Sequence, residues 1–193
     1  MNPVSSRPTI IIYIAIAILC IVTNVVAFIF QFFYHELPCP LCLLQRFGFI
    51  AIGLGALLSI IYNPSWKYDM IIFISSIYTL MVGLRQVLLH ILPHDLGYGN
   101  TFLGLHFYTW SAIISFSLIL LMSIIPIISL ILSKFSILQF YPSFVPTLIE
   151  ISLIIITLVN VFATYFECGF GICPSDPTTY LEWKNLQQLF GSS

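Results

Sequence analysis

Five long apolar segments constrain the fold of this chain more than any other feature. They span residues 9–33, 40–62, 70–92, 108–132 and 145–166. Each is long enough, as a helix, to cross a hydrocarbon core about 30 Å thick. Only 7% of the 193 residues are charged, whereas a soluble domain has about 25%. The sequence therefore predicts an all-α, polytopic membrane helix bundle, with residues 1–193 forming a single domain.

The first apolar segment is interpreted as a membrane helix rather than a cleaved signal peptide. Thr9–Phe33 has 25 residues, which is longer than the apolar region of a signal peptide, at about 7–15 residues. No small-residue cleavage site follows it. Within this helix Cys20 is expected to be an inert thiol in apolar surroundings. Asn24 is expected to hydrogen-bond to another helix.

The distribution of Lys and Arg predicts the orientation in the membrane. Arg7, Lys67 and Lys134 fall on one side of the five-helix topology, whereas Lys184 and the helix-start residue Arg46 fall on the other. Since cytoplasmic loops carry an excess of positive residues, the N-terminus is expected in the cytoplasm and the C-terminus outside. The net charge of −1 gives no indication of a nucleic-acid partner.

Four of the five cysteines form two close pairs, Cys39 with Cys42 and Cys168 with Cys173. In the predicted topology both pairs face the non-cytoplasmic side. If a helix begins with Pro40, then Cys39 is its N-cap and the sulfurs lie near the positive end of the helix dipole. Arg46 follows Cys42 by one helical turn. The dipole and the guanidinium favour thiolate, which is the reactive form in disulfide exchange.

Other interpretations of these residues stay open on spacing alone. The pair Cys39–Cys42 is also compatible with half of a zinc site or with a purely structural disulfide, and Cys168–Cys173 with a static loop-closing disulfide. Arg46 could be an ordinary interface residue whose charged end reaches towards water. Histidines 35, 94 and 106 all fall on the outer side, but scattered interface histidines do not predict a metal site, and we expect none.

Two motifs resemble the DsbB family of inner-membrane thiol oxidases. The first is the stretch Cys39–Arg46, with sequence CPLCLLQR, at the start of the second helix. The second, weaker one is Leu84–Leu89, with sequence LRQVLL, near the end of the third. The resemblance covers the first four helices. It implies a four-helix DsbB-like core to which this chain adds a fifth transmembrane helix.

The resemblance also implies roles for individual residues. Cys42 would face a membrane quinone, ubiquinone or menaquinone, and Cys39 would exchange with the second cysteine pair. Arg46 would contact the quinone, and Arg85 and His90 would flank the same pocket. The partner would be a DsbA-like periplasmic thioredoxin-fold protein, which the chain would oxidise at the bacterial inner membrane to support disulfide bond formation.

One departure from the family pattern concerns the second cysteine pair. Four-helix members carry it between helices 3 and 4, but the corresponding stretch here, residues 93–100, has no cysteine. The pair lies instead at Cys168 and Cys173, behind the extra helix. A capping-box pattern at Thr179–Glu182 then predicts a short helix that runs to Phe190, and either a place in the membrane interface or packing on the bundle is compatible with its pattern.

Two other functions remain possible on the sequence. One is a quinone-linked membrane thiol reductase, similar in style to epoxide reductases, in which electrons flow the opposite way. The other is a non-enzymatic membrane protein with two structural disulfides.

Overall fold

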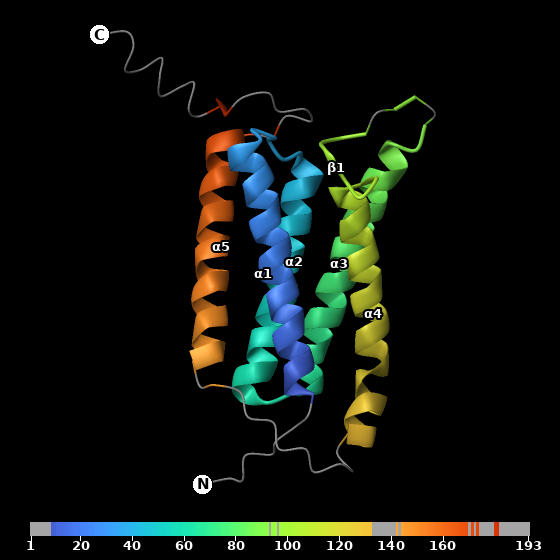
Figure 1. The fold of residues 1–193 in the computed structure, drawn as a ribbon, viewed down its shortest axis with the longest axis vertical. Helices are drawn as coiled ribbons and strands as arrows, with labels where there is room; N and C mark the ends of the chain where they lie inside the picture. Colours follow the sequence, from blue (N-terminus) through green and yellow to red (C-terminus); the bar gives the residue numbers. More distant parts are fainter. Residues whose placement is uncertain are drawn as a thin grey trace, which may run out of the picture.

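A computed structural model describes residues 9–92, 94–95, 97–132, 142, 144–169, 171, 173 and 180–181. In this part of the chain five long helices and one short hairpin form the fold (Figure 1). The helices are α1 (Ile10–Phe33), α2 (Pro40–Tyr62), α3 (Trp66–Leu89), α4 (Phe107–Leu132) and α5 (Phe144–Cys168). All five are long enough and apolar enough to cross a membrane. The predicted all-α membrane helix bundle with a fifth helix is therefore confirmed, and the single-domain division stays a prediction.

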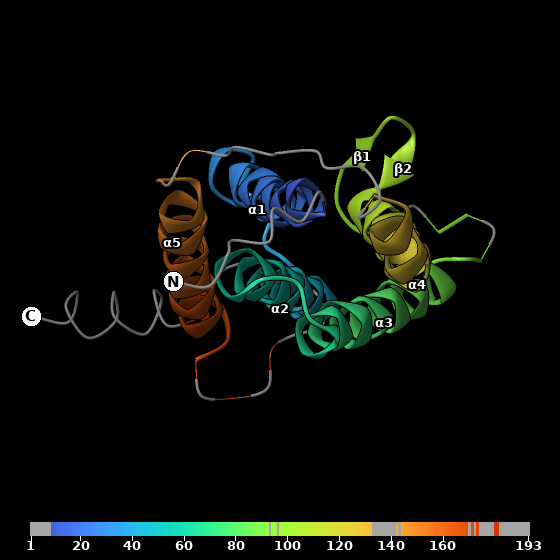
Figure 2. The ribbon, with the colours of Figure 1, turned by 90° about the horizontal axis from the view of Figure 1, so that it is seen from below.

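Helix α2 lies at the centre of the bundle. It packs against α1, α3 and α5, and more lightly against α4. Figure 2 shows α5 on one flank of the bundle, beside α1 and α2, with α4 on the opposite flank beside α3. The bundle core is apolar, and its most buried side chains include Ala17, Cys20, Ile52 and Ile72. Cys20 is thus a buried free thiol, as expected.

Glycines on α2 permit close approach of its neighbours. A Cβ at Gly48 would collide with the side chain of Thr79 on α3, and one at Gly53 would lie 3.0 Å from Leu153 on α5. Small residues at helix contacts are common in membranes, where close backbone packing replaces the hydrophobic effect as the driving force. The position of α2 at the centre therefore depends on these glycines.

The added helix α5 is joined to α1 by a buried polar contact. Asn160 Nδ2 donates to Asn24 Oδ1 over 3.3 Å, and both side chains are at most 1% exposed. The interhelical hydrogen bond predicted for Asn24 is confirmed.

The α1–α2 turn, the α3–α4 loop and the end of α5 all lie at one end of the bundle, which we call the thiol end because it holds both cysteine pairs (Figure 1). The α3–α4 loop contains a hairpin of β1 (Thr101–Phe102) and β2 (Leu105–His106). Lys67, at the start of α3, lies at the opposite end. Arg7, Lys134 and Lys184, on which the predicted orientation also depends, lie outside the described residues.

Candidate active site

The first cysteine pair occupies the start of α2. Pro40 is the first helical residue, where its missing N–H costs nothing. Cys39 is the N-cap in an extended conformation, and its sulfur accepts a hydrogen bond from the Cys42 backbone N–H over 3.2 Å. The local geometry predicted for CPLC is therefore observed. One thiol satisfies a helix-end donor that would otherwise lack a partner.

The two sulfurs of this pair are reduced and close together. Cys39 Sγ and Cys42 Sγ lie 2.6 Å apart in a hydrogen bond, somewhat more than the roughly 2.05 Å of a disulfide. The hydrogen bond with Cys42 raises the pKa of Cys39, and burial acts in the same direction. A raised pKa keeps the proton on Cys39. Cys39 is therefore the sulfur of the pair that favours the neutral form.

Gln86 on α3 contacts both sulfurs. Its Nε2 lies 3.2 Å from Cys39 Sγ and 3.4 Å from Cys42 Sγ. Its Oε1 accepts a hydrogen bond of 2.7 Å from Gln45 Nε2, which fixes the orientation of the amide. The Gln86 side chain is buried, so it provides hydrogen-bond donors for sulfur where water has no access.

Sequence reasoning singled out Arg85 and missed its neighbour Gln86. The buried residues of α3 recur at intervals of three and four: Ile72, Ser76, Thr79, Gly83 and Gln86. This spacing is that of one helix face, and Arg85 does not belong to it. Arg85 is exposed instead. The helical period of small and polar residues was the signal that could have identified Gln86.

Arg46 is buried and held from α1. Its side chain is 7% exposed, with Nη1 donating to Gln31 Oε1 over 2.6 Å and Nη2 to the Ala27 carbonyl oxygen over 3.2 Å. The guanidinium also lies over the Phe28 ring, 5.2 Å from its centroid. These contacts are not those of an interface residue reaching for water. They fix a positive charge inside the bundle, one helical turn along α2 from Cys42.

A cavity of about 270 Å³ lies beside the pair. It is bounded by α1, α2 and α4, and at the thiol end by residues 36–38 and 98–102. Cys42, Gln45 and Arg46 reach it from α2, and most of the remaining wall is apolar. At its outer edge Tyr98 donates to the Leu37 carbonyl oxygen over 2.6 Å. The cavity therefore combines an apolar volume with the thiol residue Cys42, the cation Arg46 and, at the thiol end, the acidic residue Glu36.

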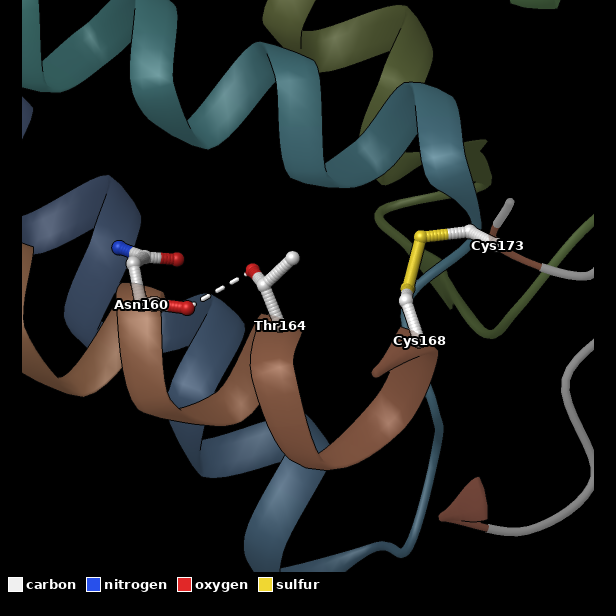
Figure 3. Close-up of a disulfide and its surroundings, with 4 residues drawn as sticks. All are labelled: Asn160, Thr164, Cys168 and Cys173. Carbon is white, nitrogen blue, oxygen red and sulfur yellow. Dashed lines mark hydrogen bonds between the residues drawn. A yellow bond between two sulfur atoms is a disulfide. The ribbon is translucent and has the colours of Figure 1, made fainter. Parts of the chain in front are cut away.

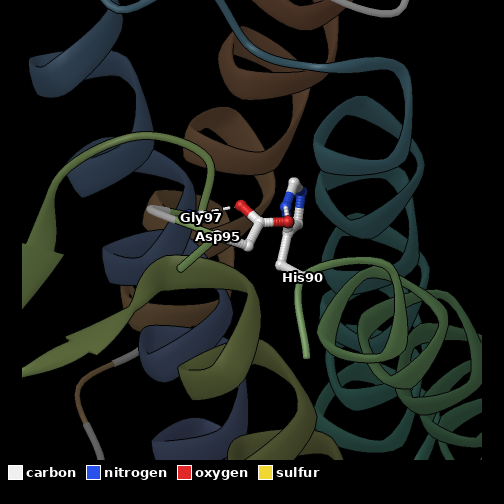
Figure 4. Close-up of polar contacts among 3 residues, drawn as sticks. All are labelled: His90, Asp95 and Gly97. Atoms are coloured by element: carbon white, nitrogen blue, oxygen red, sulfur yellow. Dashed lines mark hydrogen bonds and ion pairs between the residues drawn. The ribbon is translucent and has the colours of Figure 1, made fainter. Parts of the chain in front are cut away.

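His90 lies outside the wall of this cavity. It caps α3 and pairs with Asp95 through Nδ1 and Oδ2, 3.0 Å apart (Figure 4). Its ring stacks on Tyr108, which does line the cavity, at 5.6 Å between centroids. The Gly97 backbone N–H, and then His90, hold the pKa of Asp95 below its ordinary value. Neither His90 nor Arg85 reaches the cavity, so the cofactor-binding roles predicted for them stay predictions.

The second pair forms a disulfide at the end of α5. Cys168 is the last residue of the helix and bonds to Cys173 (Figure 3). Gly169 follows with a φ of 60° and donates its N–H to the Tyr165 carbonyl oxygen over 2.7 Å. This left-handed glycine ends the helix, as is common at C-termini. The disulfide therefore begins where the α5 backbone leaves its helical path.

Most of the predicted helix after this disulfide lies outside the described residues. Tyr180 is described, and its hydroxyl accepts a hydrogen bond of 3.2 Å from Gln31 Nε2. The chain beyond the disulfide therefore contacts the residue that holds Arg46. Within the described ranges, no three His, Cys, Asp or Glu side chains gather as possible metal ligands.

Comparison with known proteins places similarity in the first half of the chain. Residues 9–98 match the family model of disulfide bond formation protein DsbB. Disulfide bond formation protein B of Chromobacterium violaceum is 35% identical over 91 residues, which cover 43% of this chain and 55% of that protein. The protein of the same name from Marinobacter nauticus is 40% identical over 62 residues, covering 30% of this chain and 37% of that protein.

A third relative, disulfide bond formation protein B of Nitrosococcus oceani, is 37% identical over 81 residues, covering 40% of this chain and 48% of that protein. The chain thus spans about half the length, or less, of these relatives. No solved structure matches it significantly. The family match contains Cys39, Cys42 and Arg46, whereas Cys168 and Cys173 lie beyond its end.

Proposed function

We propose that this chain, whose residues 9–98 match the family model of disulfide bond formation protein DsbB, is a quinone-dependent thiol oxidase. It oxidises a DsbA-like periplasmic thioredoxin-fold protein and passes the electrons through two cysteine pairs to a membrane quinone. The pairing of a DsbA-type oxidant with DsbB and quinone is the general arrangement of the bacterial periplasm. The membrane is the bacterial inner membrane, with the thiol end in the periplasm.

The observation that carries this proposal is the cavity beside the first pair. Its wall is mostly apolar, and Cys42 and Arg46 are among the few polar or charged residues that line it. Ligand pockets of this kind are lined mainly by apolar side chains and orient the ligand through a few polar groups. A volume of about 270 Å³ suits a quinone head group, whose prenyl tail would leave between the helices. A bound quinone supplies an acceptor for two electrons and two protons.

The relay begins at the tail disulfide. A thiolate of the partner attacks one sulfur of Cys168–Cys173, breaking that bond and forming a mixed disulfide. The second thiol of the partner then attacks the partner sulfur of this mixed disulfide. The partner leaves with its own disulfide, and Cys168 and Cys173 are left reduced. These two reduce an oxidised Cys39–Cys42 pair in the same manner.

The first pair then gives up its electrons in the cavity. Cys39 keeps a proton next to Cys42, while Gln86 donates hydrogen bonds to both sulfurs and Arg46 adds a fixed positive charge. Such donors favour negative charge on the sulfur that faces the cavity. As the Cys39–Cys42 bond forms, the two thiols release two electrons and two protons, matching what the acceptor takes up.

The test is quinone reduction by the purified protein in detergent, with a reduced DsbA-like protein as electron donor. We expect steady reduction by the wild type, and loss of activity in Cys39→Ser, Cys42→Ser and Cys168→Ser. Cys20→Ala, which removes a buried thiol far from both pairs in α1, serves as the matched control. Full activity of Cys168→Ser with the partner would make the tail disulfide purely structural. Net transfer from quinol to a disulfide substrate would favour the reductase instead.

A further inference from the structure

One face of α5 is buried against the rest of the bundle, and a single ionisable side chain lies on it. The buried positions recur at intervals of three and four: Ile149, Leu153, Ile156, Asn160, Ala163 and Glu167. Glu167 is 1% exposed and directly precedes Cys168. Carboxylates are rarely buried within membrane helices, and where they are they usually mark functional sites with a charged partner.

The cation within electrostatic reach of Glu167 is Arg46 on α2, and the Cys42 sulfur is also within that reach. Helix α5, which carries Glu167, packs directly against α2. No direct ion pair joins Glu167 to Arg46 in the described part of the chain. The two hydrogen bonds of Arg46 are to Gln31 and Ala27. The carboxylate therefore acts on Arg46 through space, inside an interior that screens charge weakly.

Glu167 also has unused hydrogen-bonding capacity. Its Oε2 atom is buried and has no hydrogen-bond partner among the described residues. A buried polar atom without a partner is costly, so a role in packing alone does not account for a carboxylate here. Leucine or isoleucine at this position would continue the apolar stripe of α5 at no such cost.

We propose that Glu167 is a positioning residue that offsets the charge of Arg46 and so sets the redox balance of the Cys39–Cys42 pair. This inference rests on the proposed function and extends it, because Glu167 lies beyond the family-matched segment 9–98. The added fifth helix thus carries the second cysteine pair and also a charge that acts on the first. Other groups that interact with Arg46 are Cys39, Cys42 and Tyr180.

The sign of the effect follows from the charges. Arg46 favours thiolate over neutral sulfur in the first pair, and therefore favours its reduced form. A negative carboxylate near Arg46 opposes this preference. Removing the carboxylate should shift the pair towards dithiol, and removing the guanidinium should shift it towards disulfide. A purely structural role of Glu167 does not predict opposite shifts.

The experiment equilibrates purified, quinone-depleted protein with mixtures of reduced and oxidised dithiothreitol under nitrogen. The fraction of Cys39–Cys42 disulfide is read by alkylation and peptide mass spectrometry. For Glu167→Gln we expect the equilibrium to move up to about tenfold towards dithiol, which is the change that corresponds to one pKa unit on a cysteine sulfur. Arg46→Gln should move it the opposite way. Glu167→Asp, which keeps the charge, should stay close to the wild type.

Two further variants make the outcome decisive. Glu150→Gln removes an exposed carboxylate in the first turns of the same helix and should leave the equilibrium unchanged. Glu167→Leu removes the charge without leaving a buried polar group, so it should fold even if Glu167→Gln does not, and should give the same shift. An unchanged equilibrium in Glu167→Leu, or a shift towards disulfide, would overturn the proposal. Since no quinone is present, failure here is separate from failure of wild-type quinone reduction.

Discussion

The amide nitrogen of Gln86 lies 3.2 Å from the sulfur of Cys39, across the contact between α3 and α2. The same nitrogen lies 3.4 Å from the sulfur of Cys42. One side chain of α3 therefore contacts both thiols at the start of α2. The carbonyl oxygen of Gln86 accepts a hydrogen bond from Gln45 and a longer one, 3.8 Å, from Cys42 Sγ, while the amide N–H groups face both sulfurs.

Replacing Gln86 with leucine should slow quinone reduction at least about tenfold, because a hydrogen bond to a charged acceptor contributes about 1.5–3 kcal/mol. The bundle should remain folded, since leucine fills a similar volume on a buried face. The measurement is the rate of quinone reduction with saturating reduced partner. Leu88→Ala, an exposed position two residues further along α3, is the control. A wild-type rate in Gln86→Leu would mean that the hydrogen bonds from the amide to the sulfurs do not contribute to quinone reduction.

Arg85→Gln, made in parallel, tests the quinone contact predicted for Arg85 from the sequence. Arg85 is exposed and does not line the cavity. A raised KM for quinone in this variant would support the predicted contact, and an unchanged KM would contradict it.

Arg46→Lys should not preserve activity, although it preserves charge. The guanidinium reaches Gln31 Oε1 and the Ala27 carbonyl oxygen with two different nitrogens, whereas lysine presents one compact ammonium on a flexible stem. We expect the KM for quinone to rise at least about tenfold, in line with the loss of one charge-assisted hydrogen bond. Lys67→Gln, a change of an exposed cation at the opposite end of the bundle, should have no effect. An unchanged KM in Arg46→Lys would show that charge alone is sufficient.

The sequence was informative about the fold because membrane helices are specified by length and apolar composition, which are local properties. It also located Cys39, Cys42 and Arg46, because Pro40 fixes a helix start and the spacing fixes a helix face. Gln31 could not be found in this way. Its role comes from contacts with Arg46 and Tyr180, which are respectively 15 and 149 positions away, and no local pattern reports such contacts.

Asp95 gives the α3–α4 loop a pH-dependent stability. The pKa of Asp95 is lowered in the folded protein, first by the Gly97 N–H and then by His90. The ionised carboxylate therefore stabilises the folded protein at pH values above the ordinary pKa of 3.8. This stabilisation is lost as the pH falls through the lower pKa of the folded state. Asp95→Asn should therefore unfold at a lower temperature than the wild type at neutral pH, and the difference should shrink on acidification below 3.8. Thermal unfolding in detergent across this range is the measurement.

His90→Gln separates the two contributions to Asp95. It removes the hydrogen bond to the imidazole and leaves the Gly97 hydrogen bond, which is the larger cause of the lowered pKa. Part of the pH dependence should therefore survive in this variant. Complete loss of the dependence in His90→Gln would assign the effect to the His90 contact instead.

Asn24 and Asn160 should be energetically coupled across the contact between α1 and the added helix. Their hydrogen bond of 3.3 Å is buried, and such bonds between membrane helices contribute about 0.6 kcal/mol on average. A double-mutant cycle with Asn24→Ala and Asn160→Ala, measured by unfolding in detergent, should give a coupling energy of about this size. Ser152→Ala replaces Asn160→Ala in the control cycle, because the Ser152 hydroxyl bonds only within its own helix, to the Leu148 carbonyl. Equal coupling in both cycles would mean that apolar packing, and not the asparagine pair, holds α5 against α1.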